Sequence, residues 1–272
     1  MSFYLITGVS RGLGVIRVLR QLSGNAENTI FGLVRDKAST DKKVAAELGD
    51  RANIHILQAD TTDYEALKTA VIYVSSKTGG ALDYIIANAA LVGSWSGYDD
   101  IAGLAKEPAR LEEDLLDHFK TNVVGPVHLF NLFTPLILHG KAKKVTAIST
   151  GLADLDLTAK WDYGMGPSYS ISKAALNSAV AKFSAVYRKQ GILFMTISPG
   201  MVNTGNYIPE TEEIKKRLDE MFAIAKKHAP HREGPITPKA SVEAVLSVIE
   251  KASVDGGDGG SFVSHYGNKQ WV

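Results

Sequence analysis

The chain has 272 residues, of which 45% are hydrophobic and 22% charged, which is ordinary for one large globular domain. Its 30 basic and 29 acidic side chains nearly cancel, so no global charge attracts nucleic acid or an anionic membrane. Cysteine is absent, which excludes disulfides, thiolate metal sites and cysteine nucleophiles.

The chain begins with a strand-like apolar run that resembles neither a secretory signal nor a membrane span, and no apolar stretch approaches the roughly 20 residues that a span requires. We therefore expect a cytoplasmic protein that acts on a small molecule, without a nucleic-acid or membrane partner.

Short apolar runs alternate with helical patterns along the chain. Strands are predicted over residues 3–7, 29–34, 53–58, 82–87, 144–149, 193–198 and 261–264. Helices are predicted over residues 15–22, 41–48, 64–75, 111–138, 170–189, 212–228 and 238–252. This alternation predicts an α/β fold with a doubly wound parallel sheet of the Rossmann type and helices on both faces. No break in composition interrupts it, so we expect a single domain over residues 1–272.

A glycine-rich turn, Thr7-Gly8-Val9-Ser10-Arg11-Gly12-Leu13-Gly14, joins the first predicted strand to the first helix. Glycines here permit a sharp turn, a close approach to a pyrophosphate and tight packing of helix on strand, while the helix N-terminus presents free N–H groups to phosphates. The spacing differs from the more familiar G-x-G-x-x-G, and a plain strand–helix turn is the alternative. Its place at the first βα junction favours a dinucleotide site.

The second predicted strand ends in Val34-Arg35-Asp36. An acid near this point favours the ribose hydroxyl of NAD, whereas an arginine favours the 2′-phosphate of NADP. Arg11 adds a second cation nearby, so NADP(H) is the preferred cofactor and NAD(H) the alternative.

Tyr169 and Lys173 lie four positions apart, at i and i+4, which places both on one face of a helix. A lysine ammonium beside a phenol stabilises the phenolate and lowers the tyrosine pKa, so this tyrosine can exchange a proton with a carbonyl oxygen. Most such pairs are exposed helix decoration, and the motif acquires meaning only in combination with others.

That combination resembles the short-chain dehydrogenase/reductase family. The matching elements, in the family's order and near its spacings, are Thr7-Gly8-x-x-x-Gly12-x-Gly14, Asp60, Asn88-Ala89, Asn122, Ser149-Thr150, Tyr169-x-x-x-Lys173 and Pro199-Gly200-x-Val202-x-Thr204. They extend over almost the whole chain. The segment from Gly260 onward is similar to carbonyl-reductase-like members, including fungal ketoreductases.

The resemblance implies a role for each matched position. Tyr169 is the acid/base, Lys173 binds the nicotinamide ribose and lowers the tyrosine pKa, and Asn122 holds a relay water. The implied cofactor contacts are Gly8, Ser10, Arg11, Gly12, Leu13 and Gly14 at the pyrophosphate and adenosine, Asp60, Thr61, Asn88 and Ala89 on the adenosine side, and Pro199, Gly200, Val202 and Thr204 at the nicotinamide. Arg35 is added from its charge and its place at the end of the second strand, as the contact for the 2′-phosphate. The resemblance also implies a homodimer or homotetramer formed through the helices that hold Asn122 and Tyr169.

Departures from the family pattern lie near the catalytic groups. The family's Asn-Ala-Gly is Asn88-Ala89-Ala90 here, and its Ile-Ser-Ser is Ile148-Ser149-Thr150. Strict alignment makes Thr150 the catalytic hydroxyl, with Ser149 as the alternative if the strand end is shifted by one residue.

Two apolar segments flank the expected site. The stretch over residues 151–168 is longer than usual and carries Trp161, Tyr163 and Met165, which form either an apolar substrate wall or a self-packed surface loop. Residues 203–235 are the expected substrate lid, with one apolar helical face or, equally, a helix packed on the core. That face consists of Ile214, Leu218, Met221, Phe222 and Ala225.

The sequence thus favours NADPH-dependent reduction of a ketone or aldehyde on a hydrophobic small molecule. The alternatives are a non-redox isomerase or cyclase on the same scaffold, and a dinucleotide-sensing regulator. The scattered histidines show no metal-ligand spacing.

Overall fold

The computed structural model describes residues 1–10, 17–205, 211–230 and 234–271. Its centre is a seven-stranded sheet in the order β3-β2-β1-β4-β5-β6-β7, in which every neighbouring pair is parallel. The strands are β1 (Ser2–Thr7), β2 (Asn28–Val34), β3 (Ile54–Gln58), β4 (Tyr84–Ala87), β5 (Lys144–Ile148), β6 (Leu193–Ser198) and β7 (Phe262–Ser264). The predicted doubly wound α/β fold is confirmed.

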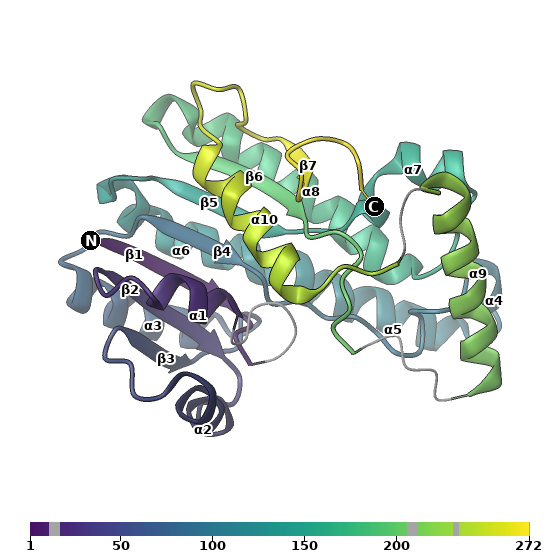
Figure 1. The fold of residues 1–272 in the computed structure, drawn as a ribbon, viewed down its shortest axis with the longest axis horizontal. Coiled ribbons are helices and arrows are strands. Elements are labelled where there is room, and N and C mark those ends of the chain that lie inside the picture. Colours follow the sequence, from purple (N-terminus) through teal and green to yellow (C-terminus); the bar gives the residue numbers. More distant parts are fainter. Residues whose placement is uncertain (11–16, 206–210, 231–233, 272) are drawn as a thin grey trace.

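Helices cover both faces of the sheet, with α1 and α10 on one side and α3, α6 and α8 on the other (Figure 1). The helices are α1 (Arg17–Ser23), α2 (Lys37–Leu48), α3 (Tyr64–Thr78), α4 (Ile101–Leu104), α5 (Pro108–Phe119), α6 (Gly125–His139), α7 (Leu155–Trp161), α8 (Pro167–Tyr187), α9 (Glu212–His228) and α10 (Pro238–Lys251). Helix α8, which carries Tyr169 and Lys173, therefore lies on the same side of the sheet as α3 and α6.

Neighbouring strand residues divide between two cores, because side chains alternate across a sheet. Leu5 and Ile85 pack with α3, α6 and α8, whereas Ile6 and Ile86 pack with α1 and α10. Both faces of these strands are buried, which explains why each reads as a continuous apolar run in the sequence.

The helix bearing the Tyr/Lys pair begins three residues before its predicted start at residue 170. Gly166 adopts a left-handed conformation (φ 64°) and Pro167 occupies the first helical position, where a missing N–H costs nothing. Tyr169 therefore lies in the first turn of α8, not before it.

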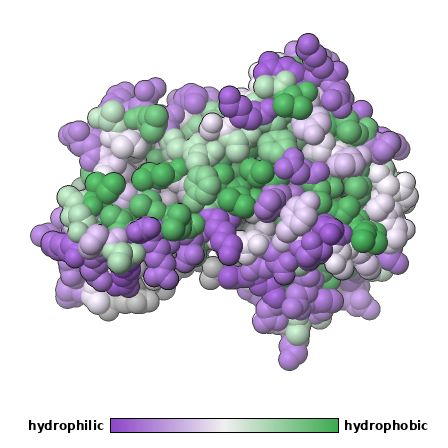
Figure 2. All heavy atoms as spheres, turned by 180° about the vertical axis from the view of Figure 1, so that it is seen from behind, coloured by the Kyte–Doolittle hydropathy of each residue, from purple (hydrophilic) through white to green (hydrophobic). Residues whose placement is uncertain are grey.

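The long helix predicted over residues 111–138 is a composite of α5, a π-helical turn η2 (Lys120–Val124) and α6. By length and composition alone, this run, Pro108–His139, is apolar enough to cross a membrane, so the expectation that no stretch approaches a span's length is wrong for this helix. Over half of its most apolar window is buried in the protein, and Phe130 and Phe133 are fully enclosed in the core. Figure 2 shows the face opposite to Figure 1, on which hydrophobic residues form a band across the middle, with hydrophilic residues above and below it.

A third apolar cluster lies apart from the two sheet cores. One element of this cluster is α7, which lies in the segment expected to form a substrate wall or a surface loop. The sequence predicted neither α7 nor α4. The buried members of this cluster are Leu157, Tyr163, Met165, Leu218, Met221 and Trp271. The cluster joins α7, α9 and the segment after β7 into one apolar layer, so the predicted wall and the predicted lid pack against each other.

Candidate active site

The carboxyl ends of β1 and β4 meet through a hydrogen-bonded corner. The Thr7 hydroxyl accepts from the main-chain N–H groups of Asn88 (3.1 Å) and Ala89 (2.9 Å). The Asn88 side chain donates back to the carbonyls of Thr7 and Gly8. This corner holds the first turn of the expected dinucleotide site against the end of β4.

Gly8 is required at this corner for two reasons. Its φ is +72°, and a Cβ at this position would lie 2.7 Å from the Cα of Ala89. Any side chain would therefore push the two strand ends apart. Ser10 is described and half-buried, whereas the predicted contacts Arg11, Gly12, Leu13 and Gly14 lie outside the described residues.

At the end of β2, Arg35 and Asp36 have different roles. Asp36 caps α2, because its carboxylate accepts from the N–H of Ser39 at 2.9 Å. Arg35 is exposed directly after the strand, and in the part of the chain that the structure describes no hydrogen bond or ion pair engages it. The acid is thus occupied by the fold, while the cation faces solvent.

After β3, Asp60 and Thr61 serve the local structure. One carboxylate oxygen of Asp60 accepts from both the N–H and the hydroxyl of Thr62, each at 2.9 Å. Thr61 is buried against Gly125 at the start of α6. The second carboxylate oxygen of Asp60 takes no part in this turn.

Tyr169 and Lys173 lie together on α8, as the spacing predicts. The Lys173 ammonium is 5.8 Å from the centre of the Tyr169 ring and donates to the carbonyl oxygen of Ile148 at 2.7 Å. Lys173 is 2% exposed, and burial lowers its pKa to about 7 because desolvation disfavours the charged form. The Lys173 side chain therefore stands near the balance between its charged and neutral forms at neutral pH.

Asn122 lies in the π-helical turn η2 and is fully buried. Its amide donates to the carbonyl of Leu91 (3.0 Å) and to the Ser172 hydroxyl (2.9 Å), and its oxygen accepts from the Leu91 N–H (2.8 Å). The Ser172 hydroxyl in turn donates to the carbonyl of Tyr169. Asn122 thus joins the segment after β4 to the helix that carries Tyr169.

Ser149 and Thr150 occupy different surroundings at the end of β5. Ser149 is 1% exposed, and its hydroxyl has no hydrogen-bond partner among the described residues. Thr150 is half-buried, lines the larger cavity described below, and accepts a 3.3 Å bond from the Leu152 N–H. The Thr150 hydroxyl proton remains available to a ligand in that cavity.

The segment after β6 packs against the residues that follow β7 and is hydrogen-bonded to α10. Gly200 has φ +83°, and a Cβ there would lie 2.7 Å from the buried His265 ring. Ser241 on α10 donates to the carbonyl of Pro199 at 2.7 Å. This segment therefore has one position relative to α10 and β7.

The main-chain N–H and carbonyl of Val202 point away from Ile236, the residue with which it pairs. Its neighbours carry the pairing with Ile236, because the Asn203 N–H donates to the Ile236 carbonyl and the Ile236 N–H to the Met201 carbonyl. In such a bridge the intervening residue directs its N–H and carbonyl to the opposite side. Thr204 follows and is half-buried.

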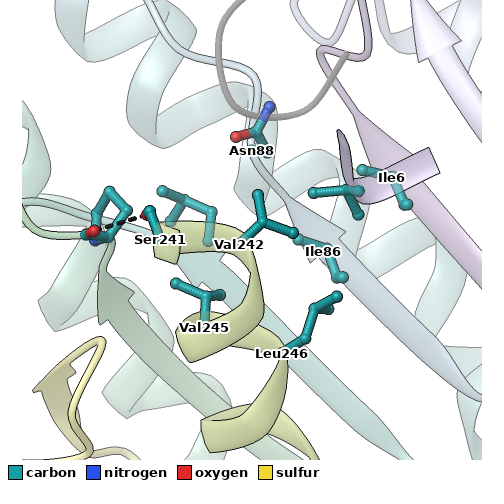
Figure 3. A pocket seen from close by; sticks show the side chains of 10 residues that line it. Ile6, Ile86, Asn88, Ser241, Val242, Val245 and Leu246 are labelled. Atoms are coloured by element: carbon teal, nitrogen blue, oxygen red, sulfur yellow. Dashed lines mark hydrogen bonds between the residues drawn. The ribbon is translucent and has the colours of Figure 1, made fainter. Parts of the chain in front are cut away.

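A cavity of about 20 Å³ lies between α10 and the sheet (Figure 3). Ile6 and Ile86 line it from the strands, Val242 and Val245 line it from α10, and Asn88 lies near its upper end (Figure 3). A water molecule needs about 10–15 Å³, so this space suits a single water and not a substrate.

A second cavity, of about 110 Å³, opens beside Thr150. The strand ends contribute Ser198, Gly200 and Met201 to its lining. The rest comes from the turn after β5, from α7 and the residues that follow it, from α9, and from the segment after β7. Its remaining apolar lining is Leu152, Leu157, Trp161, Tyr163, Met221, Ala225 and Trp271. No charged side chain of the described residues lines it, so the arrangement suits an uncharged apolar ligand next to a hydroxyl group.

No group of histidines or carboxylates within the described ranges could hold a metal ion.

Comparisons with known proteins place the chain in a family. The sequence model of the short chain dehydrogenase family matches residues 2–215. The chain belongs to the short-chain dehydrogenase/reductase (SDR) family. It is therefore an oxidoreductase-family protein, as the motifs indicate.

Among curated SDR relatives, the short chain dehydrogenase virK of Hypocrea virens is 54% identical over 272 residues, covering 100% of both chains. The short-chain dehydrogenase/reductase AacuF of Aspergillus aculeatus is 46% identical over 274 residues, again covering 100% of both. Among solved structures, the NADPH-bound carbonyl reductase from chicken fatty liver has a TM-score of 0.74 at 22% identity, covering 98% of each chain. That likeness concerns the fold.

Several residues at the site carried no signal in the sequence. Ser172 and Ser241 are ordinary helix serines by pattern, and their partners are far away along the chain. Trp271 follows the last strand, and its contact with the Gly151 segment depends on the folded path of residues 264–271. Thr7 belongs to the glycine-rich motif, but the motif by itself gives its hydroxyl no partner.

Proposed function

We propose that this SDR reduces a ketone or aldehyde on an uncharged, apolar small molecule with NADPH, and oxidises the alcohol in reverse. The observation that carries the proposal is the pairing of Tyr169 with the buried Lys173, tied to the strand end that leads to Thr150 and the apolar cavity. An acid/base, a cation and a hydroxyl donor beside an apolar cavity are the groups that carbonyl reduction requires.

The residues present fit a nicotinamide dinucleotide. Lys173 has three N–H donors and only one hydrogen bond among the described residues, and Ser149 has a buried hydroxyl without a partner. The main chain of Val202 faces away from its supporting bridge. Buried donors of this kind usually have partners, and the sugar hydroxyls and carboxamide of a nicotinamide riboside provide them.

The preference for NADPH rests on Arg35. Its guanidinium is exposed and unengaged within the described residues, while the adjacent Asp36 is occupied as a helix cap. An arginine at the end of the second strand is suited to a phosphate. NADH is the weaker alternative.

When bound, the cofactor supplies a hydride to the carbonyl carbon. Tyr169 gives its phenolic proton to the carbonyl oxygen, and Thr150 donates a hydrogen bond to the same oxygen. A Lys173 ammonium is costly in its buried position, and a tyrosinate compensates that cost. Proton transfer from Tyr169 thus converts an uncompensated buried cation into an ion pair. Both amide donors of Asn122 are engaged within the protein, so its role in holding a relay water stays a prediction.

The test is oxidation of NADPH and NADH by the purified protein against a panel of ketones, diketones and quinones. We expect turnover with NADPH, and Tyr169→Phe should lower kcat/KM by about 10²- to 10⁴-fold, the usual worth of a general acid, without loss of NADPH binding. Tight NADPH binding with no turnover of any carbonyl would contradict the proposal and favour the non-redox or sensing alternatives.

We also propose that a second copy of the chain covers part of α5 and α8. Leu116 and Phe119 on α5 and Ile171 on α8 are large apolar residues at 61%, 45% and 48% exposure, and the face behind the sheet carries an apolar band (Figure 2). A two-fold interface is self-complementary. Light scattering after size exclusion should give a dimer or tetramer that Leu116→Glu dissociates, and a monomeric native protein would overturn this part.

A further inference from the structure

Trp271 is held in place by a compact turn after β7. The N–H of Ser264 donates to the carbonyl of Asn268 at 2.7 Å, and the Asn268 side chain accepts from the Gln270 N–H at 2.9 Å. The indole stacks on Phe262 with a centroid distance of 4.3 Å. Trp271 is only 7% exposed, so its ring has a defined position.

A lysine joins this turn to α7. The Lys269 ammonium lies 5.0 Å from the centres of both the Phe262 and Trp271 rings and 3.7 Å from the carboxylate of Asp154. Asp154 caps α7. Lys269 therefore links the Trp271 ring to the start of α7, the helix that ends at Trp161.

The Trp271 ring packs against the chain directly after the candidate hydroxyl. A Cβ at Gly151 would lie 2.6 Å from the Cβ of Trp271 and 3.1 Å from its Cγ. The absence of a side chain at Gly151 thus allows the indole to lie one residue from Thr150. Both residues line the larger cavity, together with Met221 of α9.

We propose that Trp271 is the specificity-determining wall of the substrate cavity, where it stacks on a planar apolar group next to the carbonyl and limits that group's size. This inference rests on the proposed carbonyl reduction. An apolar cavity on the order of 150 Å³ accommodates a benzene ring, so the 110 Å³ found here has room for no more than one ring. The substrate class is an uncharged aryl or similarly flat ketone with about one ring in this cavity.

The experiment compares Trp271→Ala and Trp271→Phe with the native enzyme, using acetophenone and the larger 2-acetylnaphthalene with saturating NADPH. Removing the indole should raise the ratio of kcat/KM for the larger ketone over the smaller one by about 10-fold or more, since pocket size discriminates on this scale. The KM for acetophenone should rise with kcat less affected. Trp271→Phe should change the ratio in the same direction by a smaller factor. It replaces the alanine variant if that variant fails to fold.

Trp95→Ala is the matched control, because Trp95 stacks with Arg110 and does not line the cavity. It should leave the ratio unchanged. If Trp271 variants and the control give equal ratios while the native enzyme reduces both ketones, the proposed wall is overturned.

Calorimetric binding of acetophenone to the NADP⁺-saturated protein separates this inference from the function on which it rests. Weaker binding to Trp271→Ala than to the native protein, without turnover in either, would retain the wall and reject the reductase. Equal binding to both proteins would reject the wall.

Discussion

The Nζ atom of Lys173 donates a 2.7 Å hydrogen bond to the carbonyl oxygen of Ile148. This bond secures α8 to the end of β5 and holds the lysine where burial lowers its pKa to about 7, from 10.5 in the unfolded chain. Between these two pH values the unfolded chain binds a proton at this lysine that the folded protein does not bind.

The Lys173 pKa therefore predicts a pH dependence of stability. The charged lysine costs free energy of folding at and below about pH 7, and that cost is relieved as the pH rises toward 10.5. Relative to Lys173→Met, the native protein without cofactor should gain unfolding free energy between about pH 7 and 9. Urea denaturation across that range measures the difference in unfolding free energy between the two proteins. A difference that does not change with pH would contradict the lowered pKa of Lys173.

Thr150 and Ser149 should differ in their contribution to turnover. Loss of a hydrogen-bond donor to a developing oxyanion typically costs about 10²- to 10³-fold in kcat. We expect Thr150→Ala to lose activity on this scale, Thr150→Ser to keep most of it, and Ser149→Ala to affect cofactor binding more than kcat. The reverse order in steady-state kinetics would assign the catalytic hydroxyl to Ser149.

Substitution of Arg35 should change cofactor choice, whereas substitution of Asp36 should change stability. A hydrogen bond to a charged group contributes about 1.5–3 kcal/mol, so Arg35→Ala should raise the KM for NADPH by roughly 10- to 100-fold and leave the KM for NADH nearly unchanged. Asp36→Ala removes the cap of α2 and should cost about 1 kcal/mol of stability. A parallel loss of NADPH and NADH affinity in Arg35→Ala would argue against phosphate recognition.

Arg217 on α9 forms a 3.0 Å ion pair with Asp99, whose carbonyl accepts from the Gly166 N–H ahead of α8. Both side chains are about one-third exposed, so the pair is open to screening by salt. Arg217→Ala should raise the KM for apolar ketones a few-fold at low salt, and Arg217→Lys should restore part of it. Added salt should raise the native KM toward the alanine value. An identical salt response in native and variant enzymes would show that the pair does not hold the lid.

The sequence predicts the sheet well, because its strands are buried on both faces and read as continuous apolar runs. It also predicts which residues form the Tyr169 and Lys173 pair, since both lie on one helix. The start of that helix was misplaced by three residues because Gly166 and Pro167 act through backbone conformation, which an apolar pattern does not record.

The substrate side was less predictable for a different reason. Trp161 and Met221 could be assigned as wall and lid or as ordinary packing, and only the folded chain brings them into one cluster with Trp271. Likewise, Asp36 and Arg35 are equivalent candidates in the sequence, and the hydrogen bond from the Ser39 N–H shows which of them the fold already uses. Side-chain partners distant along the chain leave no periodic signal.

Asn122 joins Leu91 and Ser172 through three hydrogen bonds, of which the one to the Ser172 hydroxyl is buried. These bonds tie the segment after β4 to the helix of Tyr169, whereas α7, α9 and Trp271 contact one another largely through packed apolar side chains. Under the proposed function, α7, α9 and Trp271 are therefore exchangeable for segments of similar volume without disturbing the Tyr169 and Lys173 pair. In this architecture, diversification of substrate range is decoupled from the preservation of reactivity.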